Sequence, residues 1–205
     1  MSELKESKPQ IIQMASRVLK MWQIAYDTFM EHDRDLIPLA LEEENHINLL
    51  EKDITQWLIN FSKESDKKEV RHDAAVYADV VGDLEIIADY CKDLLERIEI
   101  KIDERLLFSE EALGEYQELY KINASALKSL LEAIEKEEVC FAKVVLKDED
   151  QVDHLVDKYR EKHNQRLLDG ICDLRSGNIF LNMLDFNAAV HHHIIKIARS
   201  ILRLR

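Results

Sequence analysis

Residues 70–102 read VRHDAAVYADVVGDLEIIADYCKDLLERIEIKI. Apolar residues recur along this stretch at alternating spacings of four and three, at Val70, Ala74, Tyr77, Val81, Leu84, Ala88, Cys91, Leu95, Ile98 and Ile102. This heptad pattern is typical of a helix that packs lengthwise against other helices. The stretch therefore predicts one long helix of a helical bundle.

The rest of the chain predicts helices as well. Among its 205 residues are only four glycines and two prolines, which are residues that turns require. Apolar residues at helical spacing predict five further helices, over about 10–31, 35–61, 109–136, 137–170 and 178–205. Asp35 and Ser109 are the expected N-caps of the second and fourth helices, and Ser176 and Gly177 precede the sixth. We expect an all-α protein.

An internal repeat is visible in this pattern. Residues 25–54 and 126–159 both read as helix, short break, helix, and their alignment at an offset of 105 places Glu44 on Glu149. Residues 77–96 align with 180–199 at an offset of 103. The agreement predicts two tandem three-helix repeats, over residues 1–105 and 106–205. The alternative is a chance alignment, because any two heptad stretches can be matched somewhere.

Charge and composition exclude several classes of partner. The formal net charge is −13 at pH 7, which repels nucleic acid and anionic membrane surfaces. No apolar run is long enough to span a membrane, and the N-terminus has no apolar signal region. The three cysteines lack CxxC spacing and are expected to be core residues in a reducing compartment. We expect a cytoplasmic chain with neither nucleic acid nor inserted membrane as its partner.

Acidic residues at helical spacing are the main candidates for a metal site. Glu85 and Asp89 stand one helical turn apart, as do Glu44 and Asn48 in the preceding helix. If these helices are neighbours, three carboxylates meet, and such oxygen ligands suit magnesium, manganese or iron. The alternative is that these pairs are solvated faces of an acidic helical protein.

The second repeat differs at the corresponding positions. Glu149 and Asp153 retain the acids, whereas Ala188 and His192 replace the other pair. His192 beside Glu149 and Asp153 favours a transition metal such as zinc or nickel. His191 falls on the apolar positions of its helix and is interpreted as a packed or hydrogen-bonded core residue. The sequence predicts neither a catalytic nor a phosphate-binding site, since it has no nucleophile elbow and no glycine-rich phosphate loop.

The segment GDLEIIADY at 82–90 is similar to the DLERIGD element of PhoU domains, and residues 179–202 resemble a diverged second copy. KIDERLLFSEEAL at 101–113 and REKHNQRLLDG at 160–170 resemble the cytoplasmic PhoU-like domain that follows the membrane part of bacterial sodium/phosphate cotransporters. The resemblance covers about 10–202 and implies tandem three-helix repeats.

For function, the resemblance implies regulation of phosphate transport through contact with a transporter or sensor protein. A membrane domain of the same polypeptide is one candidate for this partner. A homodimer is a further expectation. Some family members hold metal clusters at the acid motifs. The resemblance carries this role onto Glu44, Glu85 and Asp89, and onto Glu149 and Asp153, while Asn48, Ala188 and His192 depart from the pattern.

Two other functions are open from the residues alone. One is a metal-dependent enzyme of the carboxylate-bundle type, which requires a Glu-x-x-His pair on each of two helices. The three glutamates of the acid pairs are followed three positions later by Ile47, Ala88 and Val152, so this requirement is not met there. The other is a purely structural helical adaptor.

Overall fold

The computed structural model describes residue 4 and residues 6–204. Within them lie seven α-helices and two short 3₁₀ helices, and no strand. In chain order these are α1 (Lys8–Glu31), η1 (Arg34–Leu36), α2 (Ile37–Glu64), α3 (Lys68–Asp103), α4 (Glu110–Lys136), α5 (Val139–Val145), η2 (Leu146–Asp148), α6 (Gln151–Leu168) and α7 (Leu174–Ile201). The all-α prediction is confirmed.

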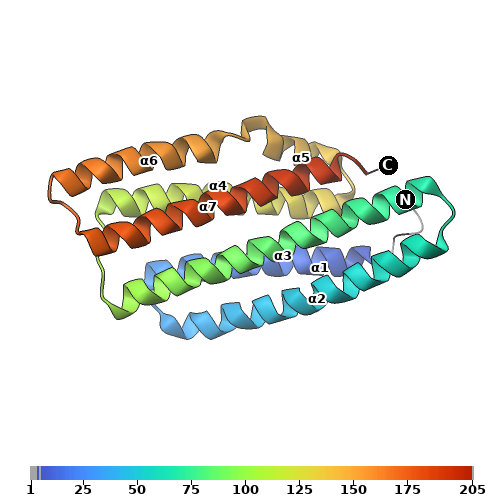
Figure 1. The fold of residues 1–205 in the computed structure, drawn as a ribbon, viewed down its shortest axis with the longest axis horizontal. Helices are drawn as coiled ribbons and strands as arrows, with labels where there is room; N and C mark the ends of the chain where they lie inside the picture. Colours follow the sequence, from blue (N-terminus) through green and yellow to red (C-terminus); the bar gives the residue numbers. More distant parts are fainter. Residues whose placement is uncertain (1–3, 5, 205) are drawn as a thin grey trace.

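The helices form an elongated bundle in which α3 and α7 lie side by side along the long axis (Figure 1). Helices α1 and α2 pack on α3, and α4, α5 and α6 pack on α7. A unit of α1–α3 and a unit of α4–α7, in which α5 and α6 together take the place of one helix, thus meet along α3 and α7, with a further contact between α1 and α4. The bundle brings α2 beside α3 and α6 beside α7, which are the helices that carry the acidic pairs.

The heptad positions of α3 form part of a core that both units share. Val81, Leu84, Ala88, Cys91 and Leu95 are almost completely buried, as the spacing predicts. The same apolar cluster includes residues of α1, α2, α4, α5 and α7. A second, smaller cluster lies within the second unit, between α4, α6 and α7. Because the larger core crosses from one unit to the other, burial of α3 and α7 stabilises both.

The expected continuous helix over 137–170 is wrong, because the structure divides it into α5, η2 and α6. The division falls at the sequence KDEDQ, residues 147–151. Three consecutive acidic residues are unfavourable within a helix but favourable just before a helix N-terminus, where the backbone dipole is positive. The new start at Gln151 therefore places Asp148, Glu149 and Asp150 at the beginning of α6.

Two helix starts also differ from expectation. Asp33, rather than Asp35, caps η1, and its carboxylate accepts a hydrogen bond from the Asp35 amide. Helix α7 begins at Leu174 because Asp173 caps it, accepting from the amides of Arg175 and Ser176. Ser109 is confirmed as the cap of α4, where its hydroxyl accepts from the Ala112 amide. A carboxylate at the N-cap satisfies backbone donors that the helix leaves free.

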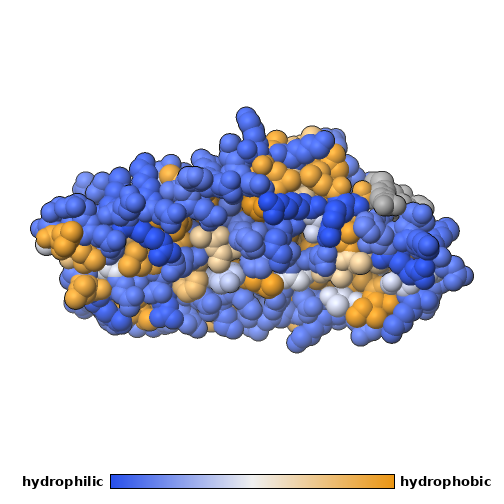
Figure 2. Space-filling view, turned by 45° about the horizontal axis from the view of Figure 1, so that its top comes forward, coloured by the Kyte–Doolittle hydropathy of each residue, from blue (hydrophilic) through white to orange (hydrophobic). Residues whose placement is uncertain are grey.

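The visible surface is largely hydrophilic, with small separate apolar patches (Figure 2). One patch lies at the end of the bundle where α6 turns into α7, and includes the exposed side chains of Leu168, Ile171 and Leu174. No helix among the described residues is long and apolar enough to cross a membrane.

Candidate functional site

Glu44 on α2 is the most buried of the predicted ligands, with 6% of its surface exposed. Its Oε1 accepts a hydrogen bond from Asn48 Nδ2 at 2.9 Å. The same oxygen forms an ion pair with Lys92 Nζ at 3.2 Å. Asn48 and Glu44 are one turn apart on α2, whereas Lys92 comes from α3. Glu44 is thus fixed between the two helices by a neighbouring amide and an opposing cation.

Glu85 and Asp89 on α3 lie within electrostatic reach of Glu44. Partial burial raises the pKa of the Glu85 carboxyl, and the negative charges of Asp89, Glu51 and Glu44 raise it further. The pKa of Asp89 is also raised, first by burial and then by Glu44, against an opposing effect of Lys92. Asp89 and Glu44 therefore lie close enough to Glu85 to influence its ionisation.

Glu51 and Lys92 lie beside these three acids, and the sequence reasoning missed both. Glu51 stands seven residues after Glu44, which is two helical turns, and this spacing was a signal that places both on one face. Lys92 follows Asp89 by three residues, and its pairing with Glu44 on another helix has no signal in local spacing. We define the acidic cluster as Glu44, Glu51, Glu85 and Asp89.

The oxygen donors of this cluster are of the kind that hard divalent cations prefer. Asn48 Oδ1 is buried and has no hydrogen-bond partner, although its Nδ2 is bound to Glu44. An unpartnered amide oxygen next to crowded carboxylates is a suitable ligand for magnesium, calcium or manganese. As the side chains stand, no three carboxylate, imidazole or thiol groups of the described residues are placed to hold an ion. Lys92 supplies positive charge at Glu44 instead.

The predicted ligands of the second unit are more dispersed. Glu149 forms an exposed ion pair with Arg199, with 2.6 Å between Oε2 and Nη2. Asp153 and His192 are both exposed, and the His192 ring makes an edge contact with His193. Arg199 gives Glu149 a cationic partner from α7, which the sequence reasoning did not anticipate. In the second unit an arginine takes the role that Lys92 has in the first.

His191 is a hydrogen-bonded core residue, as interpreted from its position. Its Nδ1 lies 2.9 Å from Asn123 Oδ1, and Asn123 Nδ2 donates to the Asn187 carbonyl at 3.0 Å. The carbonyl can only accept, so the Asn123 amide orientation is fixed and His191 Nδ1 carries the proton. Burial lowers the pKa of His191, while Asp153 raises it. This buried network joins α4 to α7 in the second unit.

The expectation for the cysteines was wrong in part. His163, a second buried histidine, is only 2% exposed and packs beside Phe180. Cys91 is buried as expected, and burial raises the pKa of its thiol, but Cys140 is exposed and Cys172 is half-buried. All three cysteines are free thiols. Cys140 lies near the start of α5, and Cys172 lies in the connection between α6 and α7. At such positions few neighbouring helices cover a side chain, so apolar neighbours in the sequence do not ensure burial.

The fold and the acidic cluster together define an all-α protein of tandem three-helix units with acids on facing helices. Residues 11–98 match the family model described as the PhoU domain. The first unit is thus similar to the PhoU domain, and the resemblance seen in its acid motifs is confirmed over these residues. No curated protein is significantly similar to it in sequence.

Solved structures show the same fold over nearly the whole chain. PhoU from Pseudomonas aeruginosa superposes with a TM-score of 0.92 at 17% sequence identity, covering 99% of this chain and 97% of that one. The phosphate transport system regulatory protein PhoU from Streptococcus pneumoniae gives a TM-score of 0.87 at 16% identity, covering 98% and 94%. At such identities, the likeness establishes the fold rather than the function.

Proposed function

We propose that this chain is a regulatory, non-catalytic protein of phosphate transport that acts in the cytoplasm by contact with a phosphate transporter or its sensor. The observation that carries the proposal is the match of residues 11–98 to the PhoU domain, together with the PhoU fold of the rest. The related protein from Streptococcus pneumoniae is itself described as a phosphate transport regulator.

Further support comes from the surface and the sequence. The face shown in Figure 2 is largely hydrophilic, the formal net charge is −13, and the helices offer long faces, which suits binding to another protein. The sequences at 101–113 and 160–170 favour, within this proposal, the cytoplasmic domain of a sodium/phosphate cotransporter over a free accessory protein.

Divalent metal binding at the acidic cluster is part of the proposal. Glu44, Glu85, Asp89 and the unpartnered Asn48 oxygen would hold magnesium, manganese or iron there. The ion would neutralise the crowded carboxylates and join α2 to α3. At the second unit, Glu149 and Asp153 with His192 would bind zinc or nickel more weakly, because Arg199 already pairs with Glu149.

The regulatory role is tested by uptake of labelled phosphate in cells of the source organism, with only the coding region of residues 1–205 deleted and then restored. Deletion should alter the change in uptake rate that follows a switch of external phosphate from low to high, and restoring the region should return the normal change. The control is Leu84→Asp, which places a charge in the buried heptad seam of α3 and should not restore regulation. Uptake that is the same in all strains at both phosphate levels would refute the role.

Metal binding is tested separately with the purified full chain. A melt with manganese or magnesium should show stabilisation that Glu85→Gln with Asp89→Asn removes. A cation at a hundred times its Kd stabilises by about 2.7 kcal/mol, which is measurable. If the double variant gains as much as the wild type, the acidic cluster is a solvated face and regulation depends on protein contacts alone.

A further inference from the structure

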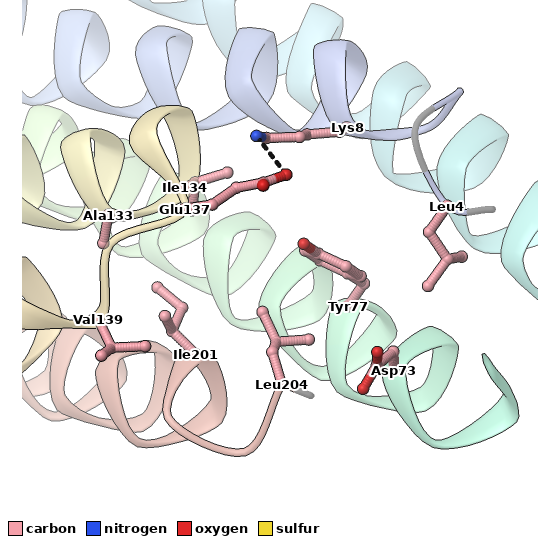
Figure 3. A pocket seen from close by; sticks show the side chains of 10 residues that line it. All are labelled: Leu4, Lys8, Asp73, Tyr77, Ala133, Ile134, Glu137, Val139, Ile201 and Leu204. Carbon is pink, nitrogen blue, oxygen red and sulfur yellow. Dashed lines mark hydrogen bonds and ion pairs between the residues drawn. The ribbon is translucent and has the colours of Figure 1, made fainter. Parts of the chain in front are cut away.

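Two hollows outside the predicted metal ligands differ in how their polar groups are satisfied. The first is a cavity of about 100 Å³ at the end of the bundle, shown in Figure 3, where Tyr77 of α3 and Ile201 of α7 bring the two units together. Its charged side chains already have partners. Lys8 Nζ lies 2.8 Å from Glu137 Oε1, and both Glu137 and Asp73 have further partners. This cavity therefore gives no indication of a ligand.

The second hollow is an open groove of about 360 Å³ in the second unit. Residues of α4 form one side, residues of α5, η2 and the start of α6 form another, and His191 of α7 also lines it. The division of the chain at KDEDQ, which separates α5 from α6, thus contributes to the groove. In the first unit α2 is undivided, and Ala88 stands at the position that corresponds to His191.

His191 brings a buried acceptor to this groove. The residue is 5% exposed, and its Nε2 has no hydrogen-bond partner in the part of the chain that the structure describes. Its Nδ1 carries the proton and is held by Asn123 Oδ1 at 2.9 Å, so Nε2 is able only to accept. A buried polar group without a partner costs free energy, which a donor bound at this point would recover. A ligand of the groove should therefore present an N–H or O–H group to Nε2.

The groups of η2 and α6 that act on this ring are acceptors too. Burial lowers the pKa of His191, Asp153 and the backbone of Glu149 raise it, and His192 lowers it further. A backbone group that raises the pKa of an imidazole is a carbonyl that accepts its proton. Asp148 adds a carboxylate to the groove and has no ion pair among the described residues. This set of acceptors favours a primary ammonium, which combines positive charge with three donors.

The α4 side of the groove presents donors instead. Lys121, Ser125 and Ser129 follow one another at one-turn spacing, so they form a row along the helix. Over the described ranges, none of the three has an ion pair or a side-chain hydrogen bond. An ammonium and two hydroxyls in a row suit a carboxylate, because a charged donor and an ionised acceptor form the stronger class of hydrogen bond.

The rest of the groove suits a small aliphatic group in a ligand without net charge. Its apolar residues are Ile122, Ala126, Val144 and Val145, and Val144 is 64% exposed. The charges around it nearly balance, in contrast to the formal charge of −13 for the chain. Glu149 is bound to Arg199, and the other charges of these segments are those of Lys121, Lys128, Lys143, Lys147, Asp148, Asp150 and Asp153.

We propose that this groove binds a free α-amino acid with an aliphatic side chain. The ammonium of the ligand donates to His191 Nε2 and Asp148, its carboxylate accepts from Lys121 and the two serines of the row, and its side chain lies against the valines of α5. The ligand thus contacts α4, η2 and α7 together, and holds the divided segment against the rest of the second unit. The inference goes beyond the proposed role in phosphate transport and does not depend on it.

The probe is L-leucine, titrated into the purified full chain by isothermal titration calorimetry. Two matched compounds each lack one charged group of leucine, since 3-methylbutylamine has no carboxylate and 4-methylpentanoate has no ammonium. Each should bind at least about tenfold more weakly than leucine. No binding of leucine at about 10 mM would overturn the proposal, as would equally tight binding of either matched compound.

Two pairs of variants locate the ligand. Asp148→Asn and Lys121→Met each remove a charge that lines the groove, and each should weaken leucine binding about fivefold. Asp150→Asn and Lys128→Met remove exposed charges from the same two segments outside the lining, and should leave the Kd unchanged. A thermal melt checks that each variant is folded. Equal effects of the lining and the control variants would overturn the assignment to this groove.

The role of His191 is measured without a substitution in its buried network. In protein labelled with ¹⁵N-histidine, donation to Nε2 should shift the resonance of that nitrogen when leucine is added. The ring nitrogens of His46 and His72, which lie in the first unit, should not respond. An Nε2 resonance of His191 that stays unchanged at saturating leucine would overturn the assignment of the ammonium to this acceptor.

Discussion

The ammonium group of Lys92 lies 3.2 Å from Oε1 of Glu44, the most buried carboxylate of the acidic cluster. This pair joins α3 to α2 and raises the pKa of Lys92, through the hydrogen bond first and the charge of Glu44 second. Lys92 therefore supplies, from within the protein, part of the positive charge that a bound cation would supply. The lysine side chain is partly exposed, so it is able to leave when a cation binds.

Lys92→Met should therefore increase the response to divalent metal. Without metal, the variant should melt slightly below the wild type, because Glu44 loses its cation. With manganese at a hundred times its Kd, it should gain about 5–10 °C, and the wild type should gain less at the same manganese concentration. Differential scanning fluorimetry measures both. Lys52→Met on the exposed side of α2 is the control, and an equal metal response in all three proteins would contradict the prediction.

Stability should depend on pH through Glu85 and Asp89. Their pKa values are raised in the folded state, so the folded protein binds these protons more readily than the unfolded chain. Their contribution to stability therefore falls as pH rises from about 4 through the folded-state pKa values.

Glu85→Gln with Asp89→Asn should accordingly melt about 2 °C higher than the wild type at pH 7 without metal. The gain should shrink as pH falls toward 4. Melting curves from pH 4.5 to 7.5 measure this, with Glu42→Gln and Asp53→Asn as the charge-matched control. A variant that is no more stable than the control at pH 7 would show that the acids do not destabilise one another.

Arg166 and Glu115 form the most buried ion pair of the second unit. Both side chains are 5% exposed, and the two guanidinium nitrogens lie 2.8 and 3.1 Å from the two carboxylate oxygens. Arg166→Met should cost about 3 kcal/mol, because Glu115 then keeps only the more distant Lys162. The double variant Arg166→Met with Glu115→Leu should recover most of this loss. The free energy of unfolding of each variant is measured by urea denaturation. A cost below about 1 kcal/mol in the single variant would mean that the carboxylate is readily solvated.

Gly177 is required by the close approach of α6 to α7. A Cβ at this position would lie 2.6 Å from His163 Nε2 and 2.7 Å from Cε1. Gly177→Ala should destabilise the protein by about 1–3 kcal/mol despite the better helix propensity of alanine. In a His163→Ala background, the same substitution should be neutral or stabilising. A double-mutant cycle by urea unfolding measures this coupling, and purely additive effects would argue against the contact.

Part of the acidic cluster was predictable from local sequence. Residues one turn apart on a helix lie on the same face, so Glu85 with Asp89 was recognisable from spacing alone. The repeat then indicated that α2 faces α3. The partners that neutralise the acids were not predictable in this way, since Lys92 and Arg199 pair with residues 48 and 50 positions earlier in the chain.

The sequence by itself determined the class of fold, because the period of apolar residues over 70–102 requires a long helix buried along one face. It also determined the duplicated acid motifs. Only the tertiary structure decided that His163 is buried against Gly177 and that a cavity opens between the two units. These features depend on how far each helix is shifted and rotated against its neighbours. That arrangement is set by side-chain packing across the whole core, which no local spacing records.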